Sequence, residues 1–398
     1  MKRTTISTAI VILIIALLSG CTNTPAQDPC LATTMSSFSQ NLFREVLATG
    51  DENPVISPLS VYYVLAMVAL GAQEDTLREF EAVLGMSPQL LAPKLYELAQ
   101  SLSNTSGSTE LNIAASVWFA NWLTVDSEFN QNMIDYFNAP AFVRDMQDPY
   151  TIDEINNWVY DQTCGLIEEI VNVLPPDTIA LLANTLYLDA RWASQINPMI
   201  MRPGLFYLET GEEVDVTFLM SRGFDFFYTS ITDYYEAVML PYDDERLGLF
   251  LVRPTNGITI RDFVATNDLT TILKELKVLP RFVGVNIPIL DVRFDITMKY
   301  LLESMGLGLA FDYENANFFG IVEENIREIL YIHEVGHAAR IEIDEEGTRA
   351  AAVTYAFMRT SYEPNFILNF NSPYVYMIYD FYTSTILFMG VVDNPIVY

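Results

Sequence analysis

The chain has 398 residues, a hydrophobic content of 51% and a formal net charge of -30 at pH 7. This length and apolar content suffice for one large domain with a sizeable core, or for two ordinary domains. So strong a negative charge argues against binding to nucleic acid and against electrostatic binding to anionic lipid, because both carry charge of the same sign.

The first 20 residues have the form of a signal peptide. Lys2 and Arg3 give a positive start, and residues 9–18 form an apolar run that is too short for an ordinary membrane span. The run ends in Leu-Ser-Gly-Cys, which resembles a lipobox, the site at which a peptidase cuts just before a cysteine that carries lipid. We therefore predict export and lipidation of Cys21, with a plain signal peptide as the alternative.

A polar tether and one large domain are expected to follow the lipid anchor. Residues 21–30 contain Cys21 and a polar, proline-containing stretch, and residues 31–398 show no linker, repeat or low-complexity segment. The remaining cysteines are Cys30 and Cys164. Export permits a disulfide between them, but one such pair far apart in sequence is weak evidence for it.

Helical patterns dominate the first half of the chain. Apolar residues recur at helical spacing in residues 38–47. Ser57 followed by Pro58 is typical of a helix start, with serine as the N-cap and proline in the first turn, and the apolar run extends to about residue 70. Further helical patterns cover residues 76–84, 90–102, 127–136 and 152–163.

Strand patterns dominate the second half. Residues 179–188 are almost continuously apolar, which is typical of a central strand buried on both faces. Residues 237–240 and 247–252 predict a hairpin around a turn at 241–246. Further strands are predicted at residues 282–294, 338–343, 366–370, 374–379 and 386–392. Helices first and strands later, without regular alternation, predict an α+β domain.

Residues 333–337, His-Glu-Val-Gly-His, match the H-E-x-x-H pattern of zinc proteases, in which a helix brings both histidines to one metal ion. The context argues against that interpretation, because Gly336 is a poor helix former and residues 340–344 alternate with the period of a strand. In a strand, His333 and His337 would lie about 13 Å apart, too far for one zinc ion. We therefore predict no metal site and expect His337 to be a buried, hydrogen-bonded residue beside the sheet.

Other catalytic patterns are absent from the sequence. The chain has two histidines in all, no G-x-S-x-G sequence and no glycine-rich phosphate loop. Its 51 carboxylates make chance pairs unavoidable, so no acid–base pair can be identified. We predict that the protein is not an enzyme.

Residues 345–357 would present two contrasting faces in an extended chain, because side chains alternate along a strand. One face is small and uncharged throughout: Thr348, Ala350, Ala352, Thr354 and Ala356. The other face is larger: Arg349, Ala351, Val353, Tyr355 and Phe357. Such a segment could enter a sheet with its small face against packed helices and with Gly347 as a hinge. An alanine-rich run also favours a helix, and the residues alone leave both structures open.

The same segment resembles the hinge of the reactive-centre loop of serpins, a family of serine protease inhibitors. The resemblance rests on Glu345, Glu346, Gly347 and Thr348, followed by Ala350, Ala351 and Ala352. Other serpin-like motifs follow in the family's order along nearly the whole chain after the tether: Asn53 to Ser60, Asn156 to Val159 with Thr163 and Gly165, Leu182 to Tyr187 with Trp192, Leu240 to Tyr242, Pro288, Gly306 to Phe311, Ala316 to Phe318, Pro373, Leu387 to Gly390, and Asn394 with Pro395.

The resemblance implies a fold and a mechanism. The serpin fold packs helices on three mainly antiparallel β-sheets and exposes a reactive-centre loop, here at about residues 345–365. A protease attacks this loop as a substrate and becomes acylated. The cleaved loop then enters the main sheet as a new strand and traps the acyl-enzyme. Serpin loop insertion is a known example of strand addition and of strain released by cleavage.

The resemblance also implies roles for residues outside the loop. Ser57, Ser60, Asn184 and His337 fall at the family's shutter, a polar cluster under the sheet where strands part, and Trp192 falls at the breach, where insertion begins. Each also has a plain interpretation as a cap or core residue. Some positions depart from the family's pattern: Asp189 and Ala190 replace Lys-Gly, His333 stands where serine is common, and Ala338 stands where lysine is common.

The scissile bond follows from the family's usual spacing. Counting from Glu345 places it at Ser361–Tyr362, counting back from Pro373 moves it to Tyr362–Glu363, and Arg359 is an alternative that would suit a trypsin-like enzyme. The partners implied are serine proteases, with cysteine proteases as a second class. No cofactor, no nucleic acid and a monomer are implied, with membrane contact only through the lipid anchor. Because the inserting face is small throughout, inhibition is favoured over the alternative of a non-inhibitory carrier or chaperone.

Overall fold

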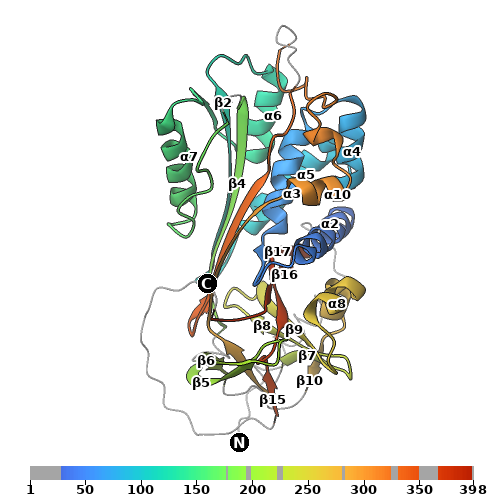
Figure 1. The fold of residues 1–398 in the computed structure, drawn as a ribbon, viewed down its shortest axis with the longest axis vertical. Coiled ribbons are helices and arrows are strands. Elements are labelled where there is room, and N and C mark those ends of the chain that lie inside the picture. The colour runs from blue at the N-terminus through green and yellow to red at the C-terminus, as the bar shows by residue number, and fades with distance from the viewer. Residues whose placement is uncertain are drawn as a thin grey trace, which may run out of the picture.

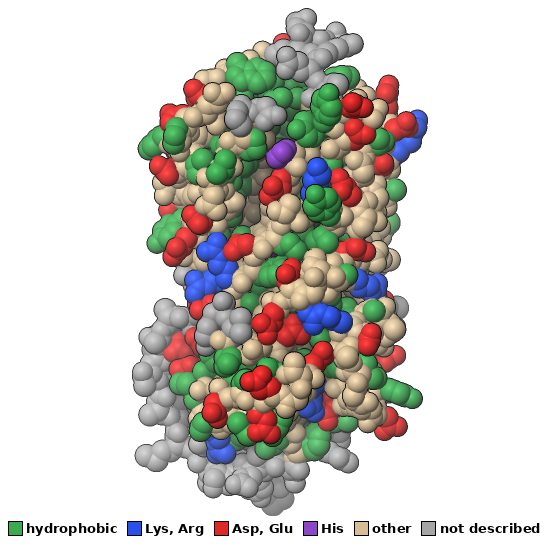
Figure 2. All heavy atoms as spheres, viewed as in Figure 1, with side chains coloured by type: hydrophobic (Ala, Val, Ile, Leu, Met, Phe, Trp, Pro, Cys, Tyr) green, Lys and Arg blue, Asp and Glu red, His purple; other side chains and the backbone are tan. Residues whose placement is uncertain are grey.

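The computed structural model describes residues 28–175, 178–193, 199–221, 227–279, 283–323, 330–348 and 366–396. The signal peptide, Cys21 and most of the loop that contains the predicted scissile bond therefore lie outside the described residues. Figure 1 shows an elongated molecule, with a long sheet and most helices in its upper part and two further sheets in its lower part. Acidic side chains are spread over the face drawn in Figure 2, with few basic side chains between them.

The helices of the described residues lie mainly in the first half of the chain, as predicted. Helix α3 starts at Pro58 as expected, because the Ser57 hydroxyl oxygen accepts a hydrogen bond from the backbone N–H of Ser60 at 3.3 Å. Almost every residue of α3 is buried, so it is a core helix. The helices are α2 (Pro29–Ala48), α3 (Pro58–Ala69), α4 (Glu74–Leu84), α5 (Pro88–Leu102), α6 (Ser127–Phe137), α7 (Pro149–Gln162), α8 (Ile260–Thr266), α9 (Leu269–Lys274) and α10 (Lys299–Ser304), with a short 3-10 turn at Leu309–Phe311.

The long sheet has six strands in the order β12-β13-β14-β4-β2-β3. Its strands are β2 (Glu110–Ala120), β3 (Ala141–Arg144), β4 (Ala180–Arg191), β12 (Leu290–Thr297), β13 (Gly336–Ile343) and β14 (Gly347–Thr348). On one face of β4, Leu186 and Leu188 join the main core cluster, and α3 contacts this strand. On the other face, Leu181 packs in a second cluster with Ile155 of α7. The predicted strand at 179–188 is therefore covered on both faces.

The other two sheets form the lower part of the molecule. A seven-stranded sheet has the order β1-β17-β16-β9-β8-β7-β10, and a four-stranded sheet has the order β15-β11-β6-β5. All pairings are antiparallel except β2 with β3 and β11 with β15. The strands are β1 (Val55–Ile56), β5 (Ile200–Tyr207), β6 (Glu213–Met220), β7 (Phe227–Ile231), β8 (Tyr235–Pro241), β9 (Leu247–Pro254), β10 (Lys277–Leu279), β11 (Val283–Pro288), β15 (Phe366–Asn369), β16 (Tyr374–Asp380) and β17 (Thr385–Val392).

The structure corrects part of the sequence interpretation. The single strand predicted at 282–294 is two strands, β11 and β12, which belong to different sheets and are separated at Ile289. The strand β2 in the first half and the β5–β6 hairpin were missed. Pro203 and Gly204 interrupt the pattern of β5, whereas β6 does alternate, with Val214, Val216 and Phe218 between polar residues. Cys30 and Cys164 are both exposed and are not joined to each other, so the structure does not contain the disulfide that export would permit. Among the described helices, none is both long and apolar enough to cross a membrane.

Candidate functional site

The predicted hinge enters the long sheet as a short strand. Gly347 pairs with Arg191 of β4, and Thr348 pairs with Ala190 of β4 and with Ile343 of β13. Thr348 is only 3% exposed. The predicted hinge residue Gly347 and the first residue of the predicted inserting segment, Thr348, therefore already lie between β13 and β4.

Close backbone packing explains why a glycine stands at residue 347. A Cβ atom built there would lie 2.1 Å from the carbonyl oxygen of Ala190, which no side chain can tolerate. The sequence predicted Gly347 as a hinge because glycine is conformationally free. The structure shows that the missing side chain of Gly347 is what lets β14 fit beside β4.

The residues just before the hinge form a tight turn out of β13. The carboxylate of Asp344 accepts hydrogen bonds from the backbone N–H groups of Glu346, at 2.8 Å, and of Gly347, at 3.2 Å. The N–H of Asp344 donates to the carbonyl of Gly347 at 3.0 Å. Glu345 and Glu346 thus occupy the turn, and the backbone reverses direction into β14.

Trp192, the predicted breach residue, donates two hydrogen bonds to this turn. Its indole Nε1 donates to the carbonyl of Asp344 at 2.9 Å, and its backbone N–H donates to the carbonyl of Glu346 at 2.9 Å. Its ring is 1% exposed and stacks on Tyr242, with 5.1 Å between ring centroids. Trp192 therefore contacts both the hinge turn and the strand end of β8.

Tyr242 is a functional candidate that sequence reasoning missed. Its hydroxyl lies 2.5 Å from Oγ1 of Thr348, and its side chain is fully buried. Burial raises the pKa of the Tyr242 hydroxyl, so it stays protonated and able to donate. Leu240-Pro241-Tyr242 was noted as a serpin-like motif, but nothing in the sequence indicated a contact with residue 348.

Ser57, Ser60 and His337 meet where α3 begins under β13. The backbone N–H of Ser57 donates to Nε2 of His337 at 3.0 Å, and the hydroxyls of Ser57 and Ser60 are 3.1 Å apart. Burial lowers the pKa of His337 to about 4, so the imidazole is neutral at pH 7 and its Nε2 can accept. The predicted hydrogen bond of His337 is present, and the residue is half-buried rather than fully buried.

Asn184, the fourth predicted shutter residue, has different partners. It lies in β4, and its Nδ2 donates to the carbonyl of Ala114 in the neighbouring β2 at 3.0 Å. Its Oδ1 is buried and has no hydrogen-bond partner within the described residues. The structure therefore brings three of the four predicted residues into contact and leaves Asn184 with an unsatisfied acceptor.

The long sheet is open beyond β14, toward the upper end of the molecule in Figure 1. β4 pairs with β2 along one edge from Ala180 to Asp189, and β13 pairs with β12 along its whole length. Within the described residues, no strand pairing joins the other edge of β4 to β13 except through β14. Figure 1 shows β4 and the orange strand beside it separating with distance from this point. We call this gap the slot.

The zinc-protease pattern does not form a metal site among the described residues. The strand β13 begins at Gly336, so His337 lies in the strand whereas His333 and Glu334 precede it, and none of the three lies in a helix. No group of three potential ligands lies together in the described part of the chain. The strand predicted at 338–343 therefore begins two residues earlier, at Gly336.

Several predicted site residues lie outside the described residues. These are Cys21, Ala350, Ala351, Ala352, Arg359, Ser361 and Tyr362. Their roles in lipidation, insertion and cleavage stay predictions.

Comparisons with known proteins agree with this architecture. The family model described as "Serpin (serine protease inhibitor)" matches residues 33–395. A serpin-like protein of the prokaryote Methanosarcina acetivorans is 26% identical over 373 residues, which cover 92% of this chain and 86% of that protein. Human neuroserpin is 28% identical over 383 residues, which cover 91% of each chain.

Solved structures share the fold. Tengpin, a thermophilic serpin, in its native state has a TM-score of 0.82 at 29% identity, with 92% of this chain and 95% of that chain covered. Thyroxine-binding globulin in complex with thyroxine has a TM-score of 0.79 at 24% identity, with 92% and 99% covered. The chain therefore belongs to the serpin family, a family of protease inhibitors and not of enzymes.

Proposed function

We propose that the protein is a suicide-substrate inhibitor of serine proteases, which traps its target by inserting the cleaved loop into the slot. The observation that carries this proposal is the position of Thr348, which already pairs with Ala190 on one side and Ile343 on the other. Cleavage would free the following residues to continue the same strand.

The register of Thr348 defines where the following residues would go. Antiparallel pairing places Ala350 between Leu188 and Ile341, and Ala352 between Leu186 and Ala339. These four strand residues belong to the main core cluster, so this face of the new strand would pack against the core. Only small side chains fit there without repacking, and the loop supplies small side chains at every second position.

The same register gives Thr354 a specific place. It would lie between Asn184 of β4 and His337 of β13. The buried Oδ1 of Asn184 lacks a hydrogen-bond donor, and a threonine hydroxyl can supply one. Insertion would therefore satisfy a polar atom that the uncleaved form leaves unpaired.

The energy of insertion is sufficient for trapping. A strand of about a dozen backbone hydrogen bonds, at roughly 1 kcal/mol net each, releases on the order of 10 kcal/mol. This equals the stability of a whole domain, about 5–15 kcal/mol, so insertion can distort an attached acyl-enzyme. The uncleaved form is metastable in this account.

The proposed cleavage site is Ser361–Tyr362, with Arg359 as the alternative. Cleavage one residue later, at Tyr362–Glu363, would suit chymotrypsin- or subtilisin-like proteases, because these cut after a large apolar residue, and cleavage after Arg359 would suit trypsin-like ones. Cysteine proteases are a second partner class. We further propose that residues 1–20 direct export, that Cys21 carries a lipid on the outer side of the membrane, and that the protein acts there as a monomer.

A carrier is the second candidate function. The similarity to thyroxine-binding globulin, at 24% identity, concerns the fold alone. A carrier need not insert its loop, so its melting temperature would not rise after loop cleavage.

The test is incubation with chymotrypsin-like, subtilisin-like and trypsin-like proteases, followed by denaturing electrophoresis. We expect a covalent complex that survives boiling in detergent with at least one protease class, and sequencing of the released fragment locates the scissile bond. Clean loop cleavage without any complex, in every class, would contradict inhibition.

A further inference from the structure

The turn between β8 and β9, residues 242–246, is a compact unit. The N–H of Tyr242 donates to the carbonyl of Leu247 at 3.1 Å, which closes the turn. The carboxylate of Asp244 accepts from the N–H groups of Arg246, at 3.0 Å, and of Leu247, at 2.9 Å. Because these bonds join both ends of the turn, a displacement of Arg246 also displaces Tyr242. We call residues 242–246 the linking turn.

One side of the linking turn contacts the hinge. Tyr242 lies against Thr348 through the 2.5 Å contact between their hydroxyl oxygens. Next to it, the N–H of Asp243 donates at 2.9 Å to the carbonyl of Arg191, the residue that pairs with Gly347. The linking turn therefore holds both residues of β14, one through a side chain and one through β4.

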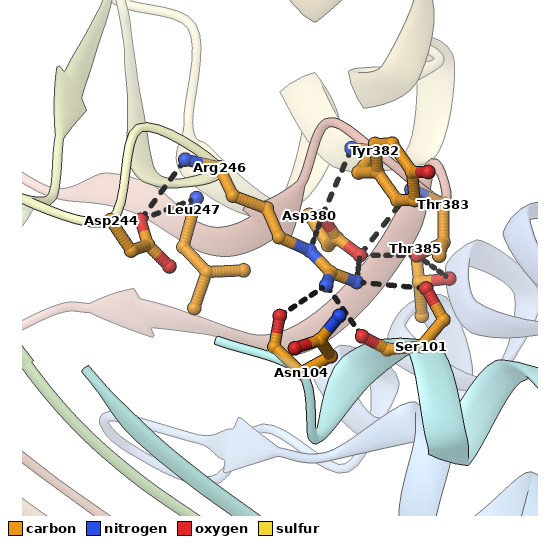
Figure 3. A network of polar contacts seen from close by, with 9 residues as sticks. All are labelled: Ser101, Asn104, Asp244, Arg246, Leu247, Asp380, Tyr382, Thr383 and Thr385. Carbon is orange, nitrogen blue, oxygen red and sulfur yellow. Dashed lines mark hydrogen bonds and ion pairs between the residues drawn. The ribbon is translucent and has the colours of Figure 1, made fainter. Parts of the chain in front are cut away.

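The other side of the linking turn is fixed by Arg246 (Figure 3). Its guanidinium donates from Nε to Oδ1 of Asp380 at 2.8 Å and from the second terminal nitrogen to Oδ2 at 2.6 Å. The first terminal nitrogen donates to the carbonyls of Ser101, at 2.5 Å, and Asn104, at 3.4 Å. Arg246 thus joins the linking turn to the C-terminal end of α5 and to the end of β16.

This junction requires an arginine. The last carbonyls of a helix lack partners within the helix and carry partial negative charge, and a planar guanidinium has enough donors to bind them and a carboxylate together. The Asp380 side chain is fully buried and that of Arg246 is 13% exposed. A lysine has one nitrogen and cannot span both groups.

We propose that Arg246 is a positioning residue for the hinge: it holds the linking turn against the end of α5 and so keeps Tyr242 where it retains Thr348 in the sheet. Loss of the Arg246 contacts would then loosen the hold of Tyr242 on the hinge. Any effect of Arg246 on protease inhibition rests on the proposed function. The coupling between Arg246 and the hinge is a property of the uncleaved protein and can be measured without a protease.

The test is amide hydrogen exchange of the uncleaved protein, read on the peptide that contains Gly347 and Thr348. Arg246→Lys and Arg246→Ala are compared with Arg253→Ala. Arg253 is the matched control because it lies in β9, the strand that follows the linking turn, pairs with Glu236 at 2.6 Å and is similarly shielded, but among the described residues makes no hydrogen bond or ion pair to the linking turn or the hinge. Each variant is measured at the same number of degrees below its own melting temperature, so that differences in global stability do not change the exchange rate.

We expect exchange at the hinge peptide to accelerate roughly tenfold in Arg246→Ala, the size typical of coupling within one hydrogen-bonded network, and less in Arg246→Lys. The Arg253→Ala control should leave hinge exchange unchanged. Unaltered exchange in both Arg246 variants, or equal acceleration in the control, would overturn the proposal. If Arg246→Ala fails to fold, the comparison of Arg246→Lys with Arg253→Lys decides it in the same way.

A double variant tests the route through Tyr242. Thr348→Val removes the hydroxyl that Tyr242 contacts, so Arg246→Ala should accelerate hinge exchange by a smaller factor in the Thr348→Val background than in the unsubstituted protein. Independent, multiplying effects of the two substitutions would overturn the proposed route. Complex formation with proteases is assayed separately, so a protein that inhibits nothing but shows the coupled exchange would refute the proposed function and leave this inference standing.

Discussion

The hydroxyl of Tyr242 lies 2.5 Å from Oγ1 of Thr348, and this contact joins the end of β8 to the first inserted residue of the loop. Both oxygens are buried, so each depends on the other for a hydrogen bond. Gly347 and Thr348 of the uncleaved protein are thereby held at the entrance of the slot, and in the proposed mechanism the cleaved loop would extend the strand from there.

Removal of the Tyr242 hydroxyl should destabilise the uncleaved protein. Tyr242→Phe leaves Thr348 Oγ1 buried without its partner, which costs about 1–3 kcal/mol of unfolding free energy. Urea unfolding measures this loss. Tyr63→Phe is the control, because the Tyr63 hydroxyl is also buried and donates to the carbonyl of Leu95 at 2.6 Å. Both variants should lose stability, but only Tyr242→Phe should increase hydrogen exchange at the hinge. Equal hinge exchange in the two variants would show that the Tyr242–Thr348 contact does not retain the hinge in the sheet.

A side chain at residue 347 should expel β14 from the sheet. In Gly347→Ala the new Cβ would meet the carbonyl of Ala190 at 2.1 Å, so Gly347 and Thr348 cannot keep their pairing. We expect fast amide exchange at both residues. Gly308→Ala is the control, because a Cβ there meets no atom within 4 Å. Slow exchange in Gly347→Ala would contradict this account, because it would show that the backbones at residues 347 and 190 lie farther apart than described.

The stability of the protein should fall as pH drops from about 6.5 to about 4. Burial lowers the pKa of His337 from 6.5 to about 4, so in this window the unfolded chain binds a proton that the folded chain does not. The loss is at most about 3 kcal/mol, and protonation also removes the acceptor for the Ser57 N–H. Urea midpoints at pH 7 and pH 4.5 measure it. His337→Gln should lack this part of the pH dependence, and an identical pH profile in the variant would contradict the assignment.

A charged residue on the inserting face should convert the inhibitor into a substrate. Thr348→Arg places a charge at a position that is 3% exposed, so insertion becomes unfavourable while the loop remains cleavable. We expect the yield of detergent-stable complex to fall at least about tenfold, because deacylation then competes with slow insertion. Arg349→Glu is the control, since residue 349 belongs to the opposite face of the extended strand. A full yield of complex from Thr348→Arg would show that trapping does not need insertion.

The parts of the fold that the sequence predicts are those set by local chemistry. The serine cap and proline at Ser57 and Pro58 define the start of α3, and continuous apolar residues define β4, because each signal lies within one element. The small residues at alternate positions after Gly347 are also a local signal. Their predicted role in insertion came from the resemblance to serpins.

The parts that were missed depend on contacts between distant residues. Ala114 and Ala115 of β2 give no alternation, and only their pairing with β4 makes that segment a strand. Tyr242 lies 106 residues before Thr348, and Asn184 donates its hydrogen bond to Ala114 of β2, so no spacing in the sequence indicates either arrangement. The need for glycine at residue 347 likewise arises from the backbone of β4.

The most direct test of the central claim is a crystal structure of the protein after cleavage in the loop. We predict that residues 349–358 form a strand between β4 and β13, with Thr354 beside Asn184 and His337 and with a hydrogen bond to Asn184 Oδ1. A cleaved molecule whose slot holds no strand beyond Thr348 would contradict the account.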